Sequence, residues 1–227
     1  MTTTRRLGIT GPLLDYDEGW RLQLRLHADV VAARLDSALV LCQHPPVYTA
    51  GTRTQASDLP RDGSPVTRVD RGGRITWHGP GQLVAYPIVR LPDPLDVVAH
   101  VRALEACLIH ACAVAGVHAE RVEGRSGAWV HGPGGDEKVA AVGVRVAEGV
   151  TMHGVALNCD PDLTAYRQIV PCGITDAGVT SLTRASGRRV TVADVVDALD
   201  ASLTAYLTRL TATGLPSARP EPVGAPR

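Results

Sequence analysis

Residues 138–158, KVAAVGVRVAEGVTMHGVALN, contain two runs of small and β-branched apolar residues with a short polar interval between them. Such runs predict β-strands, here over residues 138–146 and 151–158. Working outward from this pair, the same criteria predict six more strands, with a polar loop over residues 51–64. The strands cover residues 38–42, 65–69, 74–77, 82–90, 118–122 and 127–131.

Three helices are predicted around these strands, over residues 16–35, 95–117 and 192–210. In the last helix, Val196, Leu199 and Leu203 recur at helical spacing, and Thr191 with Asp194 forms a capping box at its start. Strands that cluster in the middle, with helices before, between and after them, favour an α+β fold over a regularly alternating one. We therefore expect a central mixed or largely antiparallel sheet flanked by helices.

The chain has 227 residues, enough for one domain with a sizeable core. It shows no internal repeat and no linker, so we expect a single domain over residues 1–213. Residues 214–227 are rich in Pro and Gly, and we expect this tail to be disordered and dispensable. The core must be mainly aliphatic, because the sequence has no Phe.

Charge and cysteine content narrow the function classes. The 23 basic and 23 acidic side chains give a net charge of zero, which offers no general attraction to nucleic acid or to a membrane surface. The five cysteines include no CxxC, and the start of the chain lacks an apolar stretch suited to a signal peptide. These features predict a cytoplasmic protein with free thiols. Residues 97–117 are apolar but carry His100, Arg102 and Glu105, so we expect a core helix there rather than a membrane span.

One cysteine differs from the others in its context. Cys172 lies between Pro171 and Gly173, at a turn that can expose a sulfur and present backbone N–H groups beside it. A thiolate there would be a strong nucleophile, whereas the usual fate of an intracellular cysteine is to be a small buried hydrophobe. We favour the nucleophile for Cys172 and the buried hydrophobe for the four cysteines in apolar strand or helix patterns, Cys42, Cys107, Cys112 and Cys159.

Lys138 is the only lysine in the chain. Lysine can lose its proton when it is desolvated, whereas arginine effectively cannot, so a single lysine in an arginine-rich chain suits an acid/base role. The alternative is a surface lysine at the end of a loop, which the neighbouring Asp136 and Glu137 favour. The residues alone leave both possibilities open.

Residues 71–82, RGGRITWHGPGQ, interleave glycines with Arg71, Arg74 and His78. Such a loop can wrap closely around a ligand and offer backbone N–H groups to an anion or an oxyanion. The alternative is a pair of hairpin turns, RGGR and HGPGQ, that join three strands. We favour ligand binding, since simple turns need neither Arg nor His. No HExxH motif occurs, so no metal site is expected. His153 could line a pocket or be an ordinary hydrogen-bonded core histidine, and without a motif the core histidine is favoured.

Five segments together resemble the lipoyl(octanoyl) transferase family, within the biotin/lipoate protein ligase superfamily. The likeness runs in order over about residues 14–210. RGG or PCG alone would mean little, but the combination is specific. The segments are HPPVYTAGTR (44–53), RGGRITWHGPGQLVAYP (71–87), KVAAVGVRV (138–146), MHGVALNC (152–159) and IVPCGI (169–174).

The resemblance implies a biotin/lipoate ligase-like fold and a defined reaction. Such enzymes take an octanoyl group from acyl carrier protein and pass it to the ε-amine of a lysine on a lipoyl domain. Cys172 matches the acyl-thioester cysteine of the family, and Lys138 matches the lysine that supports it. The substrate-binding segments of the family match Arg71, Gly72, Gly73, Arg74, Ile75, Thr76, Trp77, His78, Ala141, Val142, Gly143, Gly154, Val155 and Ala156.

The expected partners are octanoyl-acyl carrier protein as donor, and the lipoyl domains of 2-oxoacid dehydrogenase complexes and the glycine cleavage H protein as acceptors. No cofactor or ATP is expected, because thioester exchange is nearly balanced and amide formation runs downhill. Nothing in the sequence demands more than a monomer. Three alternatives remain: an ATP-dependent lipoate or biotin protein ligase, an amidotransferase whose catalytic cysteine lies elsewhere, and a non-catalytic binder of lipoyl domains or carrier proteins.

Overall fold

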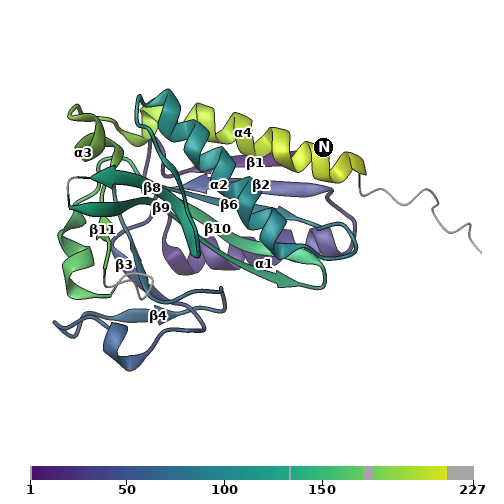
Figure 1. Ribbon diagram of the computed structural model, residues 1–227. Coiled ribbons are helices and arrows are strands. Elements are labelled where there is room, and N and C mark those ends of the chain that lie inside the picture. The colour runs from purple at the N-terminus through teal and green to yellow at the C-terminus, as the bar shows by residue number, and fades with distance from the viewer. Residues whose placement is uncertain (1, 133, 171–175, 214–227) are drawn as a thin grey trace, which may run out of the picture.

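A computed structural model describes residues 2–132, 134–170 and 176–213. Within these ranges the main feature is an eight-stranded sheet in which two strand pairs are parallel and the others antiparallel (Figure 1). This confirms the predicted α+β fold with a mixed, largely antiparallel sheet. Seven strands follow one another across the sheet and β11 (Gly178–Val179) pairs with β9; the order is β1 (Thr2–Leu7), β2 (Ser37–Cys42), β6 (Gln82–Val89), β10 (Val150–Asn158), β9 (Gly135–Ala147), β8 (Arg125–Gly132) and β7 (Glu120–Val122).

Helices cover both faces of this sheet. The helices α2 (Val97–Val114) and α4 (Val192–Thr213) pack together on one face, and α1 (Tyr16–Val31) packs on the other (Figure 1). The α1 face carries its own apolar cluster, which includes Leu22 and Leu26 of the helix and Val84 of β6. The sheet is therefore the middle of three layers.

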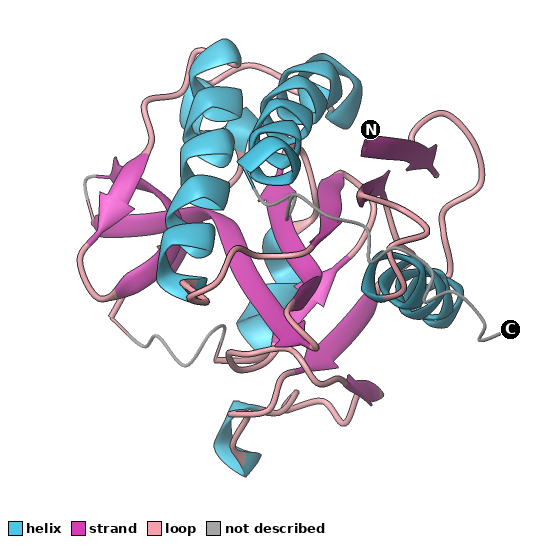
Figure 2. Cartoon of the chain, turned by 90° about the vertical axis from the view of Figure 1, so that its right-hand side faces the viewer, coloured by secondary structure: helices cyan, strands magenta, loops and turns pink. Residues whose placement is uncertain are grey.

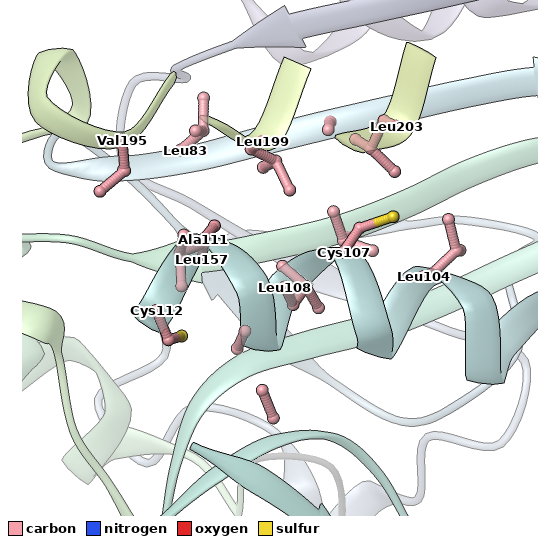
Figure 3. Packing of buried hydrophobic residues seen from close by; sticks show 14 of the residues in the cluster. Leu83, Leu104, Cys107, Leu108, Ala111, Cys112, Leu157, Val195, Leu199 and Leu203 are labelled. Carbon is pink, nitrogen blue, oxygen red and sulfur yellow. The ribbon is translucent and has the colours of Figure 1, made fainter. Parts of the chain in front are cut away.

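The main core lies between the sheet and the α2–α4 pair. Leu104 and Leu108 of α2 and Leu199 and Leu203 of α4 fill it, and all four are fully buried (Figure 3). Burying one such side chain stabilises the fold by about 1.5–3 kcal/mol, so this layer anchors both helices. By length and composition alone α2 could cross a membrane, but its apolar face packs into this core, as the sequence predicts.

The ends of the helices follow local rules. At the start of α4, Asp194 accepts the backbone N–H of Thr191 at 2.7 Å, which is one half of the predicted capping box, and the Thr191 hydroxyl donates to the same carboxylate at 2.8 Å. α1 ends four residues before the predicted end, where Ala33 adopts a left-handed backbone conformation with φ of 53°. The sequence did not predict β1, β3 (Val47–Ala50), β11, the short helix α3 (Leu182–Ser186), or the 3-10 turns Ala56–Asp58 and Leu163–Gln168.

A second, smaller sheet forms a lobe at the bottom of Figures 1 and 2. It contains β3 (Val47–Ala50), β4 (Val66–Arg68) and β5 (Thr76–His78), in the order β4-β3-β5. The alternative of two hairpin turns is wrong, because β4 and β5 each pair with β3 and not with each other. The HGPGQ turn after β5 leads instead into β6 of the main sheet.

The interface of α2 and α4 contains a buried histidine that should make stability depend on pH. His100 bonds to the hydroxyl of Tyr206 at 2.7 Å, its Nε2 has no partner, and burial lowers its pKa to about 4. An unfolded histidine titrates near pH 6.5, so the unfolded chain takes up the proton first and stability falls as the pH drops from about 6.5 to about 4.

We expect His100 to account for on the order of 3 kcal/mol of this loss by pH 4. Denaturant unfolding of the wild type and of His100→Gln, measured between pH 7.5 and pH 4.5, tests it. The variant should lose less stability over this range than the wild type, although His78, whose pKa is also lowered by burial, keeps part of the slope. Equal slopes for the two proteins would contradict this assignment.

Candidate active site

A pocket of about 540 Å³ opens on the α1 face of the sheet, beside Tyr16 at the start of that helix. Its described walls come from the loop between β4 and β5, from the central strands β6, β9 and β10, and from the start of β8. Most of the residues singled out in the sequence meet here. Those that line it are Arg71, Gly72, Gly73, Arg74, Thr76, His78, Lys138, Ala141, Val142, Gly143, Gly154, Val155 and Ala156.

Two of the predicted substrate-binding residues, Ile75 and Trp77, lie outside the lining. Ile75 is fully buried and Trp77 nearly so, and both belong to the apolar cluster of the small sheet. Thr76 and His78, which alternate with them, line the pocket. Successive residues of an extended segment point to opposite sides, so one half of this segment lines the pocket and the other half anchors it.

The guanidinium of Arg71 holds the loop together. It is buried, and it donates to the carbonyl oxygens of Thr49 at 2.7 Å, Arg74 at 2.8 Å and Gly72 at 3.1 Å. Gly51 allows this close packing, since a Cβ there would lie 2.8 Å from the guanidinium. These contacts give Arg71 a structural role that the sequence did not predict.

Small residues leave room over the middle of the sheet. Ala141 of β9 lies opposite Ala156 of β10, and Gly143 lies opposite Gly154. A Cβ on Gly154 would come within 2.2 Å of the carbonyl oxygen of Ala85, so this position admits only glycine without a shift of the backbone. Two pairs of small residues thus keep the pocket open where larger side chains would fill it.

Lys138 lies in the wall of the pocket on β9 and is only 8% exposed, so the surface-lysine alternative is wrong. Its ammonium lies over the ring of Trp129, 4.7 Å from the centroid. Among the described residues it has no hydrogen-bond or ion-pair partner. The neighbouring carboxylates are engaged elsewhere, Asp136 with His131 at 2.6 Å and Glu137 with Arg184 at 3.5 Å.

Cys172 lies outside the described residues, but the chain on both sides of its segment is placed. Before it, Val170 donates its N–H to the carbonyl oxygen of Asp58. After it, Asp176 forms an ion pair of 2.5 Å with Arg125, which lines the pocket. Strand β11 then runs beside β9, with Val179 opposite Lys138. The chain therefore leaves the segment of Cys172 along the strand that carries Lys138.

The other four cysteines are buried, as the sequence predicts. Burial raises the pKa of Cys107 to about 11 and that of Cys112 to about 12, and it also raises the pKa of Cys42 and Cys159. A thiol of this kind is almost never ionised near neutral pH, so none of the four is a candidate nucleophile.

His78, which lines the pocket, begins a buried network of hydrogen bonds. Its Nδ1 lies 2.6 Å from Oε1 of Gln82, and Nε2 of Gln82 donates to Oδ1 of Asn158 at 2.8 Å. Asn158 in turn donates to the carbonyl oxygen of Thr180 at 3.0 Å, and the Thr180 N–H donates to the carbonyl oxygen of Lys138 at 3.0 Å. A continuous set of hydrogen bonds thus joins His78 to the strand of Lys138.

His153 lines the pocket, although sequence reasoning favoured an ordinary core histidine. Its backbone has a φ of 58°, which is rare for a residue with a side chain and is held by the bond from its N–H to Gln23. Its Nε2 lies 2.8 Å from Asp70, which also pairs with Arg145. Its place in the MHGVALNC segment was the available signal. Of the other lining residues, Arg53, Val84 and Tyr86 also lie in segments that carry the resemblance, and the sequence did not point to Tyr16, Gln55, Gly124, Arg125 and Ser126.

The charged side chains among the described lining residues are all cationic. Four arginines and one lysine line the pocket, and its described walls contain no carboxylate. Burial lowers the pKa of His78 to about 3 and also lowers that of His153, so both imidazoles are neutral near pH 7. No group of side chains suited to a metal ion occurs among the described residues. Such a pocket favours a ligand or transition state that carries negative charge.

Comparison with known proteins identifies the family of this chain. Residues 15–204 match the model of the lipoyl protein ligase A/B catalytic domain. The chain belongs to this family. A protein of Clavibacter sepedonicus named octanoyltransferase is 59% identical over 96% of both chains. Another octanoyltransferase, of Salinispora arenicola, is 58% identical over 89% of this chain and 96% of its own.

Solved structures of the family share the fold at low sequence identity. The lipoate protein ligase of Thermoplasma acidophilum, solved as part of an archaeal lipoylation system, superposes with a TM-score of 0.65 at 16% identity, over 92% of this chain and 85% of its own. A lipoate-protein ligase A bound with ATP gives a TM-score of 0.60, also at 16% identity, over 91% and 86% of the two chains. The predicted ligase-like architecture is therefore confirmed.

The bonding of Arg71 predicts that its loss destabilises the fold. Arg71→Met would leave buried carbonyl oxygens without a donor, at a cost of about 1–3 kcal/mol. Arg53→Met is the matched control, since Arg53 lines the same pocket, is exposed, and has no side-chain bond among the described residues. We expect the control to stay within about 0.5 kcal/mol of the wild type in denaturant unfolding. A stable Arg71→Met protein would mean that the guanidinium serves the ligand and not the loop.

Proposed function

We propose that this protein is an octanoyltransferase, which moves an octanoyl group from acyl carrier protein to the ε-amine of a lysine on a lipoyl domain. The observation that carries the proposal is the pocket, where the only lysine of the chain meets three segments singled out in the sequence. Relatives named octanoyltransferases, which match nearly the whole chain, support the same activity.

Cys172 is the proposed nucleophile. Its thiolate attacks the carbonyl carbon of the incoming thioester, the carbon–sulfur bond to the carrier breaks, and the octanoyl group becomes a thioester on Cys172. Among the five cysteines it alone lies between proline and glycine, and the other four are buried with raised pKa values. Its position four residues before Asp176, which pairs with the lining residue Arg125, supports this role.

Lys138 is the proposed acid and base. A free cysteine has a pKa of about 8.5, so near neutral pH most of the cysteine is the unreactive thiol and a base is needed to form the thiolate. Lys138 takes the thiol proton, stabilises the thiolate, and returns a proton to the departing carrier thiol. In the second half it removes the first proton of the acceptor lysine, which arrives as an ammonium ion.

The remaining walls of the pocket suit the negative charge of the transition state and the apolar acyl chain. The tetrahedral oxyanion needs N–H donors, and the cationic lining with its glycine-rich loop suits it; one such donor is typically worth about 2.7–4 kcal/mol. Ala141, Val142, Val155 and Ala156 offer an apolar surface to the eight-carbon chain. Each buried methylene contributes about 0.8 kcal/mol, so the depth of this surface selects the chain length.

We further propose that the protein acts in the cytoplasm as a monomer. On this view its donor is octanoyl-acyl carrier protein, and its acceptors are the lipoyl domains of 2-oxoacid dehydrogenase complexes and the glycine cleavage H protein. Its fold is shared with lipoate ligases, so an ATP-dependent ligase is the second candidate.

The covalent intermediate provides the decisive test. The purified protein is mixed with octanoyl-acyl carrier protein, without ATP or acceptor, and its intact mass is recorded. We expect one octanoyl group on Cys172, removable by hydroxylamine and transferred to added lipoyl domain, and no adduct on Cys172→Ser. If the acceptor is modified only when free octanoate and ATP are supplied, the protein is a ligase.

A proton-transfer role for Lys138 predicts that a side chain with the same charge but no releasable proton cannot replace it. Lys138→Arg keeps the positive charge but cannot release a proton, so we expect adduct formation to slow by about 10²-fold or more. Lys138→Met should be impaired at least as strongly. Rates of adduct formation follow from the mass of samples quenched over time. Full activity of Lys138→Arg would show that Lys138 acts only through its charge.

A further inference from the structure

We propose that Nε2 of His78 is the hydrogen-bond acceptor for the attacking amine, and that it takes the proton which the nitrogen loses as the amide forms. The inference rests on the proposed function and adds a catalytic residue to its second half. It separates the two protons of the reaction, since Lys138 removes the one that makes the amine neutral and His78 removes the next.

The hydrogen bonds around Gln82 fix the tautomer of His78. The amide nitrogen of Gln82 donates to Oδ1 of Asn158 and lies 2.9 Å from the hydroxyl of Tyr166, which itself donates to the carbonyl oxygen of Trp77. Asn158 must present its oxygen, because its own nitrogen donates to Thr180. Oε1 of Gln82 therefore faces His78, and an amide oxygen can only accept.

Nδ1 of His78 consequently carries the hydrogen, and Nε2 carries the lone pair. Nε2 has no partner among the described residues, and it is not one of their fully buried unpaired atoms. Since His78 is 7% exposed and lines the pocket, this lone pair is open to the pocket. The ring is held in place by Tyr16, whose ring stacks on it with centroids 6.1 Å apart.

The sheet register relates the segment of His78 to that of Lys138. Gln82 lies opposite Asn158 on β10, one residue beyond the pair of Leu157 with Ala140 of β9. Gln82 is thus almost level with Lys138, two strands away, so about 10 Å separate their backbones. Strand β10 occupies this interval within the sheet, and the side chains of His78 and Lys138 both line the pocket.

His153, the other histidine that lines the pocket, lies too far from Lys138 for this role. His153 lies opposite Val144, six residues along β9 from Lys138, or about 20 Å away at the rise of a strand. Its Nε2 is also committed to Asp70. An eight-carbon chain is shorter than this separation, so His153 belongs to the far end of the pocket.

The proposed step balances as follows. The nitrogen of the neutral amine bonds to the octanoyl carbonyl carbon, and the carbon–sulfur bond to Cys172 breaks with its electron pair left on sulfur. The proton released by nitrogen moves to Nε2 of His78. Burial lowers the pKa of His78 to about 3, so its imidazole is a weak base that holds this proton only briefly, and the proton passes to the thiolate, which is the stronger base. The free thiol of Cys172 is restored.

A comparison of two nucleophiles tests the inference. The acyl-enzyme is formed on the wild type, on His78→Phe, which keeps a ring but has no acceptor, and on His100→Gln, a buried histidine outside the pocket. Decay of the adduct is then followed by intact mass, once with lipoyl domain and once with hydroxylamine. Hydroxylamine is mostly neutral near pH 7 and attacks thioesters without a general base.

We expect His78→Phe to form the adduct at a near-normal rate and to release it to hydroxylamine normally, but to transfer it to lipoyl domain about 10²-fold more slowly. His100→Gln should match the wild type with both nucleophiles. If His78→Phe forms no adduct, the smaller His78→Asn is tested in the same way.

Three outcomes would overturn the inference: normal transfer to lipoyl domain, equal slowing with both nucleophiles, or loss of the adduct in both His78 variants. These outcomes leave the proposed function intact as long as the wild type forms its adduct on Cys172. Absence of that adduct in the wild type overturns the proposed function itself.

Discussion

The pairing of β9 with β10, and of β10 with β6, is the constraint on which the pocket depends. One register sets Ala141 opposite Ala156 and Gly143 opposite Gly154, so that the middle of the sheet carries almost no side-chain volume. The same register brings Asn158 opposite Gln82, where their side chains bond. A slip by one residue would turn every side chain to the other face, closing the floor and breaking the polar network together. The close approach of Gly154 to the carbonyl oxygen of Ala85 helps to exclude such a slip, because a neighbouring residue with a Cβ would not fit there.

The long elements could be predicted from the sequence with their bounds, whereas several short ones, and the pairing of the rest, could not. The helix α4 and the strands β6, β9 and β10 have enough residues for periodicity, composition and caps to agree, and their predicted bounds are close to those observed. The strands β3, β4 and β5 have only three or four residues each, and they pair with partners that no local pattern reveals. Strand β1 is polar and partly exposed at an edge of the sheet, so it gives no apolar signal. The prediction of one sheet therefore missed the lobe that supplies a wall of the pocket.

For the residues of the site, the sequence predicted location better than it predicted the role of each side chain. Position along a motif placed most of them correctly in the pocket, since a motif records which residues come together. It did not reveal what each side chain does there. Arg71 has the appearance of an anion ligand in the sequence, yet its guanidinium donates to the carbonyl oxygens of Arg74 in its own loop and of Thr49 on β3. Tyr16 enters the pocket from a helix that carries no motif, and only the tertiary structure brings it in.

Lys138 is buried in the wall of the pocket without an ion pair among the described residues, since Asp136 and Glu137 bond to other partners. The face of Trp129 provides a weaker attraction that positions the ammonium, and it accepts no proton in return. An arginine in this place could not release a proton, so the proposed acid/base role gives a physical reason for the single lysine of an otherwise arginine-rich chain.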